Sequence, residues 1–161
     1  MNMRLSTHID APQEDIFTAA SDFEHAADVV SAIDKVEFTA PAADGSPVGV
    51  GAKFKETRTM FGKQATEEME VTEFDPPRAY TLSAVSCGVQ YHSRVQVIEE
   101  TPGSSGDGCR LNYDINSKPI TLSAKILGPI MGLAMKGAMR KAMEQDLADI
   151  KNHLEHKPQQ H

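Results

Sequence analysis

Residues 122–154 read LSAKILGPIMGLAMKGAMRKAMEQDLADIKNHL, and this stretch decides the fold. Its apolar side chains recur at spacings of three and four residues, most regularly from Met135 through Met143 to Leu154. This period is typical of an amphipathic helix that buries one stripe. At about 1.5 Å per residue the helix would extend roughly 48 Å, long enough to lie across an entire sheet. We therefore predict one long helix near the C-terminus.

The pair Gly128-Pro129 lies within this stretch. Proline removes a helical hydrogen bond and crowds the preceding turn. The pair therefore predicts a kink in the helix, or the point at which the helix truly begins. Residues 129–154 are expected to pack on the concave face of a sheet built from residues 3–9 and 35–118.

The part of the chain before the helix alternates polar and apolar residues with a period of two, which indicates β-strands. One strand is expected around residues 36–38, and the others cover residues 49–61, 64–74, 79–86, 91–99 and 109–116. Phe61-Gly62-Lys63 predicts a tight reversal, and Pro76-Pro77 ends a strand because proline cannot continue an inner one. Short connections of this kind make neighbouring strands antiparallel.

The first strand is expected over residues 3–9, which also alternate. The pairs Asp10–Gln13 and Ser21–Glu24 have the spacing of helical capping boxes. Two short helices should therefore follow the first strand.

These elements predict the α+β class: a curved antiparallel sheet of about six to seven strands wrapped around the long C-terminal helix. Residues 1–154 are expected to form a single domain and residues 155–161 a frayed tail. A chain of 161 residues is long enough for one domain with a substantial core.

The composition narrows the classes of partner. Hydrophobic residues make up 40% of the chain and the formal net charge is −7. An acidic chain without a basic stripe repels phosphate backbones, so no nucleic-acid partner is expected.

Residues 1–20 contain no apolar signal region. The apolar stretch near residues 126–135 is too short and too interrupted to cross a bilayer, so no transmembrane segment is predicted. Cys87 and Cys109 lack a metal-type spacing. They are best interpreted as reduced thiols, with a pair across strands as the alternative, and a cytoplasmic location is expected.

Four phrases of the sequence, in their order of appearance, carry a family resemblance. They are HIDAPQEDIFTAASDFE (8–24), GVGAKFKETRT (49–59), VTEFDPPRAYTL (71–82) and KAMEQDLADIKNHLE (141–155). They resemble the START/polyketide-cyclase-like (SRPBCC) superfamily, whose members have the helix-grip fold. The resemblance implies a deep cavity between sheet and long helix that holds an apolar or amphipathic molecule. Members include lipid and hormone carriers, aromatic polyketide cyclases, ubiquinone-binding helpers and co-chaperones.

The strand over residues 49–61 presents Phe54, Glu56, Arg58 and Met60 on one face, which we expect to point inward because it holds the apolar members. Buried charges are costly unless they are paired. Glu56 and Arg58 would therefore need each other or a polar group of a ligand. The alternative is that the cavity mouth is wet and the pair is solvated.

Two further strands add candidates. Tyr91 is expected to point inward and His92 outward, so His92 is interpreted as a surface histidine rather than a general base. Leu111 and Tyr113 are also expected inside. The Tyr113 hydroxyl could bond to a ligand, or the ring could be a core aromatic with its hydroxyl at the rim.

Methionine side chains are flexible and polarisable, which suits a cavity that adapts to its guest, and they equally serve as ordinary core filling. The predicted ligand-binding set is Phe54, Glu56, Arg58, Met60, Met69, Tyr91, Leu111, Tyr113, Met131 and Met135. The sequence has no zinc-type cluster, no nucleophile elbow and no P-loop. No catalytic residue, metal site or cofactor is therefore predicted.

Three functions are open. We prefer the binding or carriage of a small hydrophobic or amphipathic molecule (a lipid, an aromatic or a polyketide-like compound). The alternative is an enzyme of the polyketide cyclase or dehydratase type, in which Arg58 would stabilise an enolate and Glu56 or Tyr113 would move the proton. The third is an interaction module that assists a chaperone or a respiratory protein. The sequence leaves the ligand and the oligomeric state open.

Overall fold

The computed structural model describes residues 1–100 and 108–156, apart from the side chains of residues 130 and 131. Seven strands, two α-helices and one 3₁₀ turn precede a final long helix. In chain order they are β1 (Asn2–Ile9), α1 (Gln13–Ser21), η1 (Phe23–His25), α2 (Ala26–Val29), β2 (Ile33–Ala40), β3 (Lys53–Met60), β4 (Lys63–Asp75), β5 (Ala79–Ser86), β6 (Val89–Glu99), β7 (Cys109–Pro119) and α3 (Leu122–Glu155). The α+β class and the order of its elements are confirmed.

The strands form one antiparallel sheet in the order β1-β7-β6-β5-β4-β3-β2. Strands β2 to β7 are neighbours in the sheet in their order along the chain, and β1 pairs with β7, which brings the first strand beside the last. Tight turns explain the hairpins: Phe61 and Gly62 between β3 and β4, and Cys87 and Gly88 between β5 and β6, all have positive φ. Such dihedral angles match the right-handed twist of the flanking strands.

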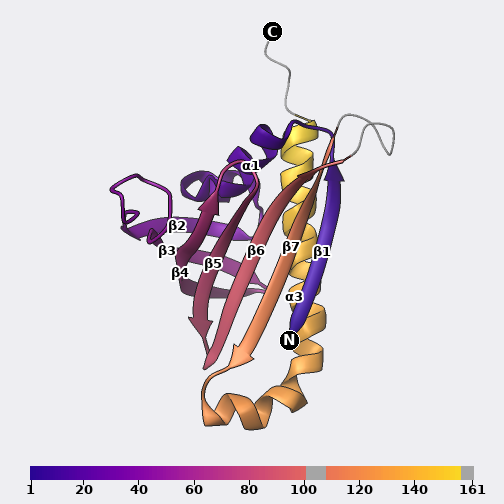
Figure 1. Cartoon of the computed structure of the whole chain (residues 1–161). Coiled ribbons are helices and arrows are strands. Elements are labelled where there is room, and N and C mark those ends of the chain that lie inside the picture. The colour runs from indigo at the N-terminus through magenta and orange to yellow at the C-terminus, as the bar shows by residue number, and fades with distance from the viewer. Residues whose placement is uncertain (101–107, 157–161) are drawn as a thin grey trace.

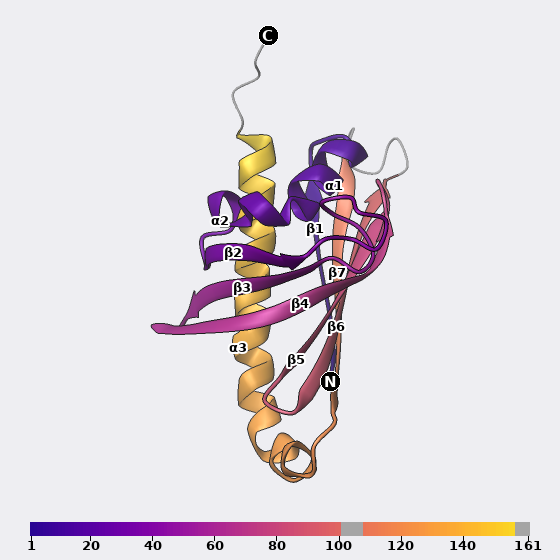
Figure 2. The same cartoon turned by 90° about the vertical axis from the view of Figure 1, so that its left-hand side faces the viewer.

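The sheet curves strongly, and α3 runs along its concave side (Figures 1 and 2). The helix packs mainly against β1 and also contacts β7, α1 and α2. Figure 2 shows β2, β3 and β4 crossing the helix, while β5 to β7 run more nearly along it. Helix α3 therefore covers part of the concave face of the sheet.

The core lies at the end of the sheet that α1 and α2 cover. Its largest fully buried side chains are Ile9, Ile16, Phe54, Val71 and Leu111. Aromatic rings tie the helices to the sheet: Phe23 of η1 stacks on Phe54 with ring centroids 4.8 Å apart. Helix α3 adds two buried apolar residues to this core, Leu147 and Ile150.

Helix α3 continues through the proline that was expected to kink it or to mark its start. Pro129 lies inside the helix, and Thr121 caps the N-terminus by accepting a hydrogen bond from the amide of Ala124. The first turns of α3 lie across one end of the molecule, and the rest runs along the sheet at a steep angle to them (Figures 1 and 2). A proline within a helix causes such a bend. The start-point alternative is therefore wrong, because the helix begins at Leu122.

Both expected capping boxes are wrong. No side chain caps α1, and the Gln13 amide instead donates to the carbonyl of Val97 on β6 at 2.9 Å. Ser21 is the last residue of α1, and its hydroxyl donates back to the carbonyl of Phe17. Hydrogen bonds elsewhere thus replace the local ones that the spacing indicated.

Hydrogen bonds hold the C-terminal end of α3. Glu155 is the last residue of α3 and accepts hydrogen bonds from Lys151 and from the amide of Asp10, whereas residues 157–161 of the expected tail lie outside the described part.

Cys87 is exposed and Cys109 is buried, and both are free thiols. None of the described helices has the length and apolar composition that a bilayer crossing requires.

Candidate functional site

The cross-strand register settles which side chains share the concave face. Phe54 on β3 lies opposite Met69 on β4, Met69 opposite Ala84 on β5, and Ala84 opposite Tyr91 on β6. Directly opposed residues of antiparallel strands point to the same face. The buried Phe54 therefore places this whole row inside.

The same reasoning places the other strand residues. Val95 on β6 lies opposite Tyr113 on β7, and Tyr113 opposite the buried Leu5 on β1. The expected inward orientation of Tyr91, Leu111 and Tyr113 agrees with this register, and His92 is exposed on the outer face.

The ten predicted site residues do not share one environment. Phe54 and Leu111 are fully buried within the core, so they support the site from behind. Four are half-buried: Met60, Met69, Tyr91 and Tyr113. Met135 is 54% exposed, and the side chain of Met131 lies outside the described residues. The remaining two, Glu56 and Arg58, belong to a polar cluster.

Arg58 is the centre of that cluster. Its Nε donates to Oε1 of Glu56 at 2.9 Å, and its Nη2 donates to Oδ2 of Asp146 at 3.0 Å. Glu56 and Arg58 lie two residues apart on β3, whereas Asp146 lies on α3. The cluster therefore joins the sheet to the helix. Glu56 and Arg58 are therefore paired with each other, which is one of the two ways in which their charges were expected to be compensated.

Two atoms of the cluster have no hydrogen-bond partner in the described structure. They are Nη1 of Arg58, a donor, and Oδ1 of Asp146, an acceptor, and both are buried. The Asp146 side chain is only 6% exposed. A buried polar atom without a partner costs free energy of about 1–3 kcal/mol, so this donor and acceptor mark a place where a further polar group would be stabilised.

Burial changes the protonation of the acidic members of the site. It raises the pKa of Asp146 to about 6, against the opposing effect of the Arg58 guanidinium. Burial likewise raises the pKa of the Tyr113 hydroxyl, and the nearby Asp146 carboxylate adds to that rise. Near neutral pH, Asp146 can therefore exchange a proton, while Tyr113 keeps its own.

The chemistry of this cluster follows from its charges. One guanidinium faces two carboxylates, so the cluster is electrically balanced when Asp146 is protonated. Arg58 can stabilise negative charge on a bound molecule, and Asp146 can accept or donate a proton. A perturbed carboxyl beside a specific cation is a common feature of functional sites, although structural ion pairs also have it.

The concave side of the sheet and the helix that faces it also carry apolar side chains of intermediate exposure. Leu82, Tyr91, Met139 and Met143 are partly buried and pack against the core without being sealed within it. Met139 and Met143 lie seven and three residues before Asp146, on the face of α3 that meets the sheet. We use the name concave groove for these side chains together with Met69 and Tyr113, which point to the same face of the sheet.

Sequence reasoning missed Asp146. The residue lies three positions after Met143 and four before Ile150, at the spacing of the buried stripe. A carboxylate at such a position is costly unless it is paired. A charged residue at a position of the buried stripe was therefore the sequence signal that could have identified Asp146.

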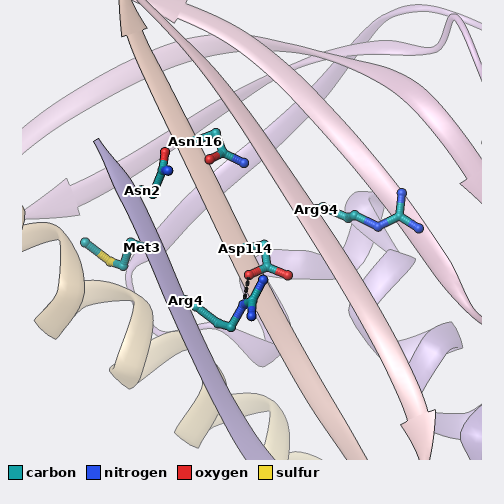
Figure 3. Close-up of a pocket in the computed structure, with 6 residues that line it drawn as sticks. All are labelled: Asn2, Met3, Arg4, Arg94, Asp114 and Asn116. Atoms are coloured by element: carbon teal, nitrogen blue, oxygen red, sulfur yellow. Dashed lines mark hydrogen bonds and ion pairs between the residues drawn. The ribbon is translucent and has the colours of Figure 1, made fainter.

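Two surface hollows lie elsewhere. One, of about 370 Å³, is on the outer face of the sheet and is lined by Asn2, Met3, Arg4, Arg94, Asp114 and Asn116 (Figure 3). Arg4 and Asp114 form an ion pair there. The other, of about 400 Å³, lies beside β2 and the segment that follows it. Neither hollow includes any of the ten predicted site residues.

Metal binding has no support among the residues that the structure describes, where no three His, Cys, Asp or Glu side chains come close enough to hold an ion.

Comparison with known proteins gives a family and a fold. A family model described as "Polyketide cyclase / dehydrase and lipid transport" matches residues 1–155. No curated protein matches the sequence.

Three solved structures share the fold at low identity. A START superfamily protein from Mycobacterium smegmatis is 16% identical with a TM-score of 0.75, over 96% of this chain and 97% of that one. The di-domain ARO/CYC BexL from the BE-7585A biosynthetic pathway is 16% identical with a TM-score of 0.76, over 98% of this chain and 51% of that one. Norcoclaurine synthase from Thalictrum flavum, in complex with dopamine and hydroxybenzaldehyde, is 19% identical with a TM-score of 0.61, over 99% of this chain and 89% of that one.

Proposed function

Because this chain belongs to the polyketide cyclase/dehydrase and lipid transport family, we propose that it binds and carries a small amphipathic molecule in the concave groove. The apolar body of the guest lies against Tyr91, Met139 and Met143. Its polar end reaches the Arg58–Asp146 pair. The supporting observation is the unpartnered donor and acceptor of that pair, which joins the sheet to the same helix that carries the partly buried Met139 and Met143.

The polar end of the guest is a hydroxyl group. Nη1 of Arg58 can only donate, and ionised Oδ1 of Asp146 can only accept. A hydroxyl accepts one hydrogen bond and donates another, so a single hydroxyl satisfies both atoms. The norcoclaurine synthase structure, which holds dopamine and hydroxybenzaldehyde, shows that this fold can accommodate hydroxylated aromatic molecules.

The remaining predicted members of the ligand-binding set have supporting roles in this proposal. Met60 and Met69 extend the wall on β3 and β4, and Phe54 and Leu111 hold it from behind. Met135 is exposed enough to border the entrance. We place the protein in the cytoplasm, which is consistent with the exposed free thiol of Cys87.

A matched pair of ligands tests the proposal. The fluorescent probe 2-naphthol and the parent naphthalene share their ring system and differ by one hydroxyl. Hydrogen bonds to charged groups contribute about 1.5–3 kcal/mol, so 2-naphthol should bind about ten- to a hundred-fold more tightly. Equal affinities would show that the pair does not anchor the guest.

A second variant pair places the guest in the groove. Met139→Trp should fill the groove and weaken 2-naphthol binding at least about ten-fold. Ala134→Trp adds the same ring at an exposed position of α3 and should leave the affinity unchanged. Unchanged binding in a folded Met139→Trp variant would remove the groove as the site.

An enzymatic role is the second candidate, and the pKa of Asp146, raised by burial to about 6, favours it. In a cyclase or dehydratase, Arg58 would stabilise an enolate and Asp146 would move the proton. The reaction can be followed as cyclisation of a synthetic poly-β-ketone. If the protein is an enzyme, Asp146→Asn should lose turnover while keeping substrate binding. If it is a carrier, neither the wild type nor Asp146→Asn should form product.

A further inference from the structure

The first half of α3 exposes an unusual number of large apolar side chains. Leu133 is 84% exposed and Ile126 is 63% exposed. Leu122 and Leu127 of the same helix, and Ile120 just before it, are also exposed. Large contiguous apolar surface on a folded protein marks a place where something else binds.

The charges of the same segment are all of one sign. Residues 115–143 contain five lysines and arginines and no aspartate or glutamate, in a chain whose net charge is −7. These five residues are exposed: Lys118, Lys125, Lys136, Arg140 and Lys141. Arg140 has a partner within the helix, since its Nε lies 3.5 Å from Oε1 of Glu144.

The apolar and basic side chains occur together. Leu133, Lys136 and Arg140 are spaced by three and four residues, so they lie on one face of α3. Leu147 lies seven residues after Arg140 on the same face and is buried where the helix packs against the core, so it is the earlier part of this face that is exposed. A helix with exposed leucines and isoleucines among lysines and arginines is the type that lies in a membrane interface.

The position of the segment adds a functional argument. The amide of Ile120 donates to the carbonyl of Gly88 at 2.8 Å, which fixes the start of α3 to the β5–β6 turn. Figures 1 and 2 show the first turns of α3 at one end of the molecule, away from α1. Tyr91 and Met139 of the concave groove lie on the two elements that reach this end.

We propose that the segment Ile120–Lys141 docks on an anionic phospholipid surface, with Ile126, Leu127 and Leu133 among the acyl chains and its lysines at the headgroups. A second copy of this chain is a poorer occupant. A two-fold interface would place the same five cations opposite one another, and like charges repel. Nucleic acid would leave the exposed leucines and isoleucines in water. The docking does not depend on what occupies the groove.

The absence of tryptophan from the natural sequence permits a clean test. The Leu133→Trp variant of the 161-residue chain carries one reporter, at an exposed position where substitution should not disturb folding. Adding phosphatidylglycerol vesicles should move its emission to shorter wavelength, and pure phosphatidylcholine vesicles should move it much less. His92→Trp, on the outer face of the sheet, is the matched control and should not respond.

Charge variants test the electrostatic part. Each lysine near an anionic surface strengthens binding about five-fold. Lys136→Gln/Lys141→Gln in the reporter background should therefore weaken partitioning about 25-fold. Lys53→Gln/Lys55→Gln changes the net charge equally on β3 and should have little effect.

Three results would overturn the proposal. The first is an unchanged Leu133→Trp spectrum with anionic vesicles. The second is equal partitioning of both double-glutamine variants. The third is a spectral shift that grows with protein concentration in the absence of lipid, together with a dimer in light scattering, because it would assign the surface to a second copy of the chain.

Discussion

The guanidinium of Arg58 and the carboxylate of Asp146 meet across the concave face, with Nη2 and Oδ2 at 3.0 Å. Arg58 comes from an inner strand of the sheet and Asp146 from the helix that lies over it. The pair therefore contributes both to the attachment of α3 and to the chemistry of the groove. Glu56 also bonds to Arg58. When Asp146 is protonated, the single carboxylate charge of Glu56 therefore balances the positive charge of Arg58.

The first prediction concerns the pH dependence of stability. Burial raises the pKa of Asp146 from 3.8 to about 6 in the folded protein. The resulting stabilisation is complete below about pH 4 and is lost as the pH rises through about 6. The difference in unfolding free energy between the wild type and Asp146→Asn should therefore fall by roughly 3 kcal/mol between about pH 4 and pH 8.

Urea unfolding at a series of pH values measures that difference. Asp149→Asn on the same helix is the control with the opposite sign. Burial raises the pKa of Asp149, but hydrogen bonds from Ser31 outweigh this effect and lower it. Its stabilising contribution should therefore grow with pH. Parallel pH profiles for the two variants would contradict the assigned proton.

The second prediction concerns Arg58→Met. This change leaves Glu56 and Asp146 buried together without a cation. Removing one partner of a buried ion pair costs about 3–5 kcal/mol, so the unfolding free energy at pH 8 should fall by that amount. Arg4→Met removes the exposed partner of Asp114 and should change the unfolding free energy little, because solvent screens an exposed ion pair. Similar losses in the two variants would mean that the cluster is effectively solvated.

The third prediction tests the packing of α3. Leu147 is 3% exposed, so Leu147→Ala should reduce the unfolding free energy by about 2–5 kcal/mol. Leu133→Ala makes the same change at an exposed position and should stay within about 0.5 kcal/mol of the wild type. Chemical denaturation of both variants is sufficient. A small effect at Leu147 would show that α3 is not packed on the sheet as described.

The fourth prediction concerns His8, whose Nε2 bonds to Asp10 and whose Nδ1 bonds to Glu100, both at 2.8 Å. Hydrogen bonding to Asp10, supported by Glu100 and opposed by partial burial, raises the pKa of His8. Lys151 and Arg110 face the same network through the His8 carbonyl and Glu100. The wild type should exceed His8→Gln in melting temperature at pH 6, and the difference should shrink as the pH rises through the raised pKa. A constant difference would show that the charged imidazole does not contribute.

Much of this fold could be predicted from periodicity alone. The alternation around Phe54 and Tyr91 identified the inner face of two strands, because a strand has two faces and only one can be apolar. The long stripe of α3 likewise predicted its packing. The two capping boxes failed because Gln13 and Ser21 use other hydrogen bonds, which depend on tertiary structure and on the end of α1.

The site was harder to predict than the fold. Glu56 and Arg58 were recognised because they interrupt an apolar face, but their partner Asp146 lies 88 residues from Arg58 along the chain. No local pattern reports such a contact. Met135 illustrates the reverse problem: it continues the stripe in sequence but is exposed, because the sheet does not cover that part of α3.

The central claim is that the concave groove binds an apolar molecule whose hydroxyl meets Arg58 and Asp146. Methyl NMR of the eight methionines tests it most directly, because these residues are distributed inside and outside the groove. Saturating 2-naphthol should shift the methyl signals of Met69, Met139 and Met143 and leave that of the exposed Met1 unchanged. Saturation without any shift at Met139 and Met143 would contradict the account.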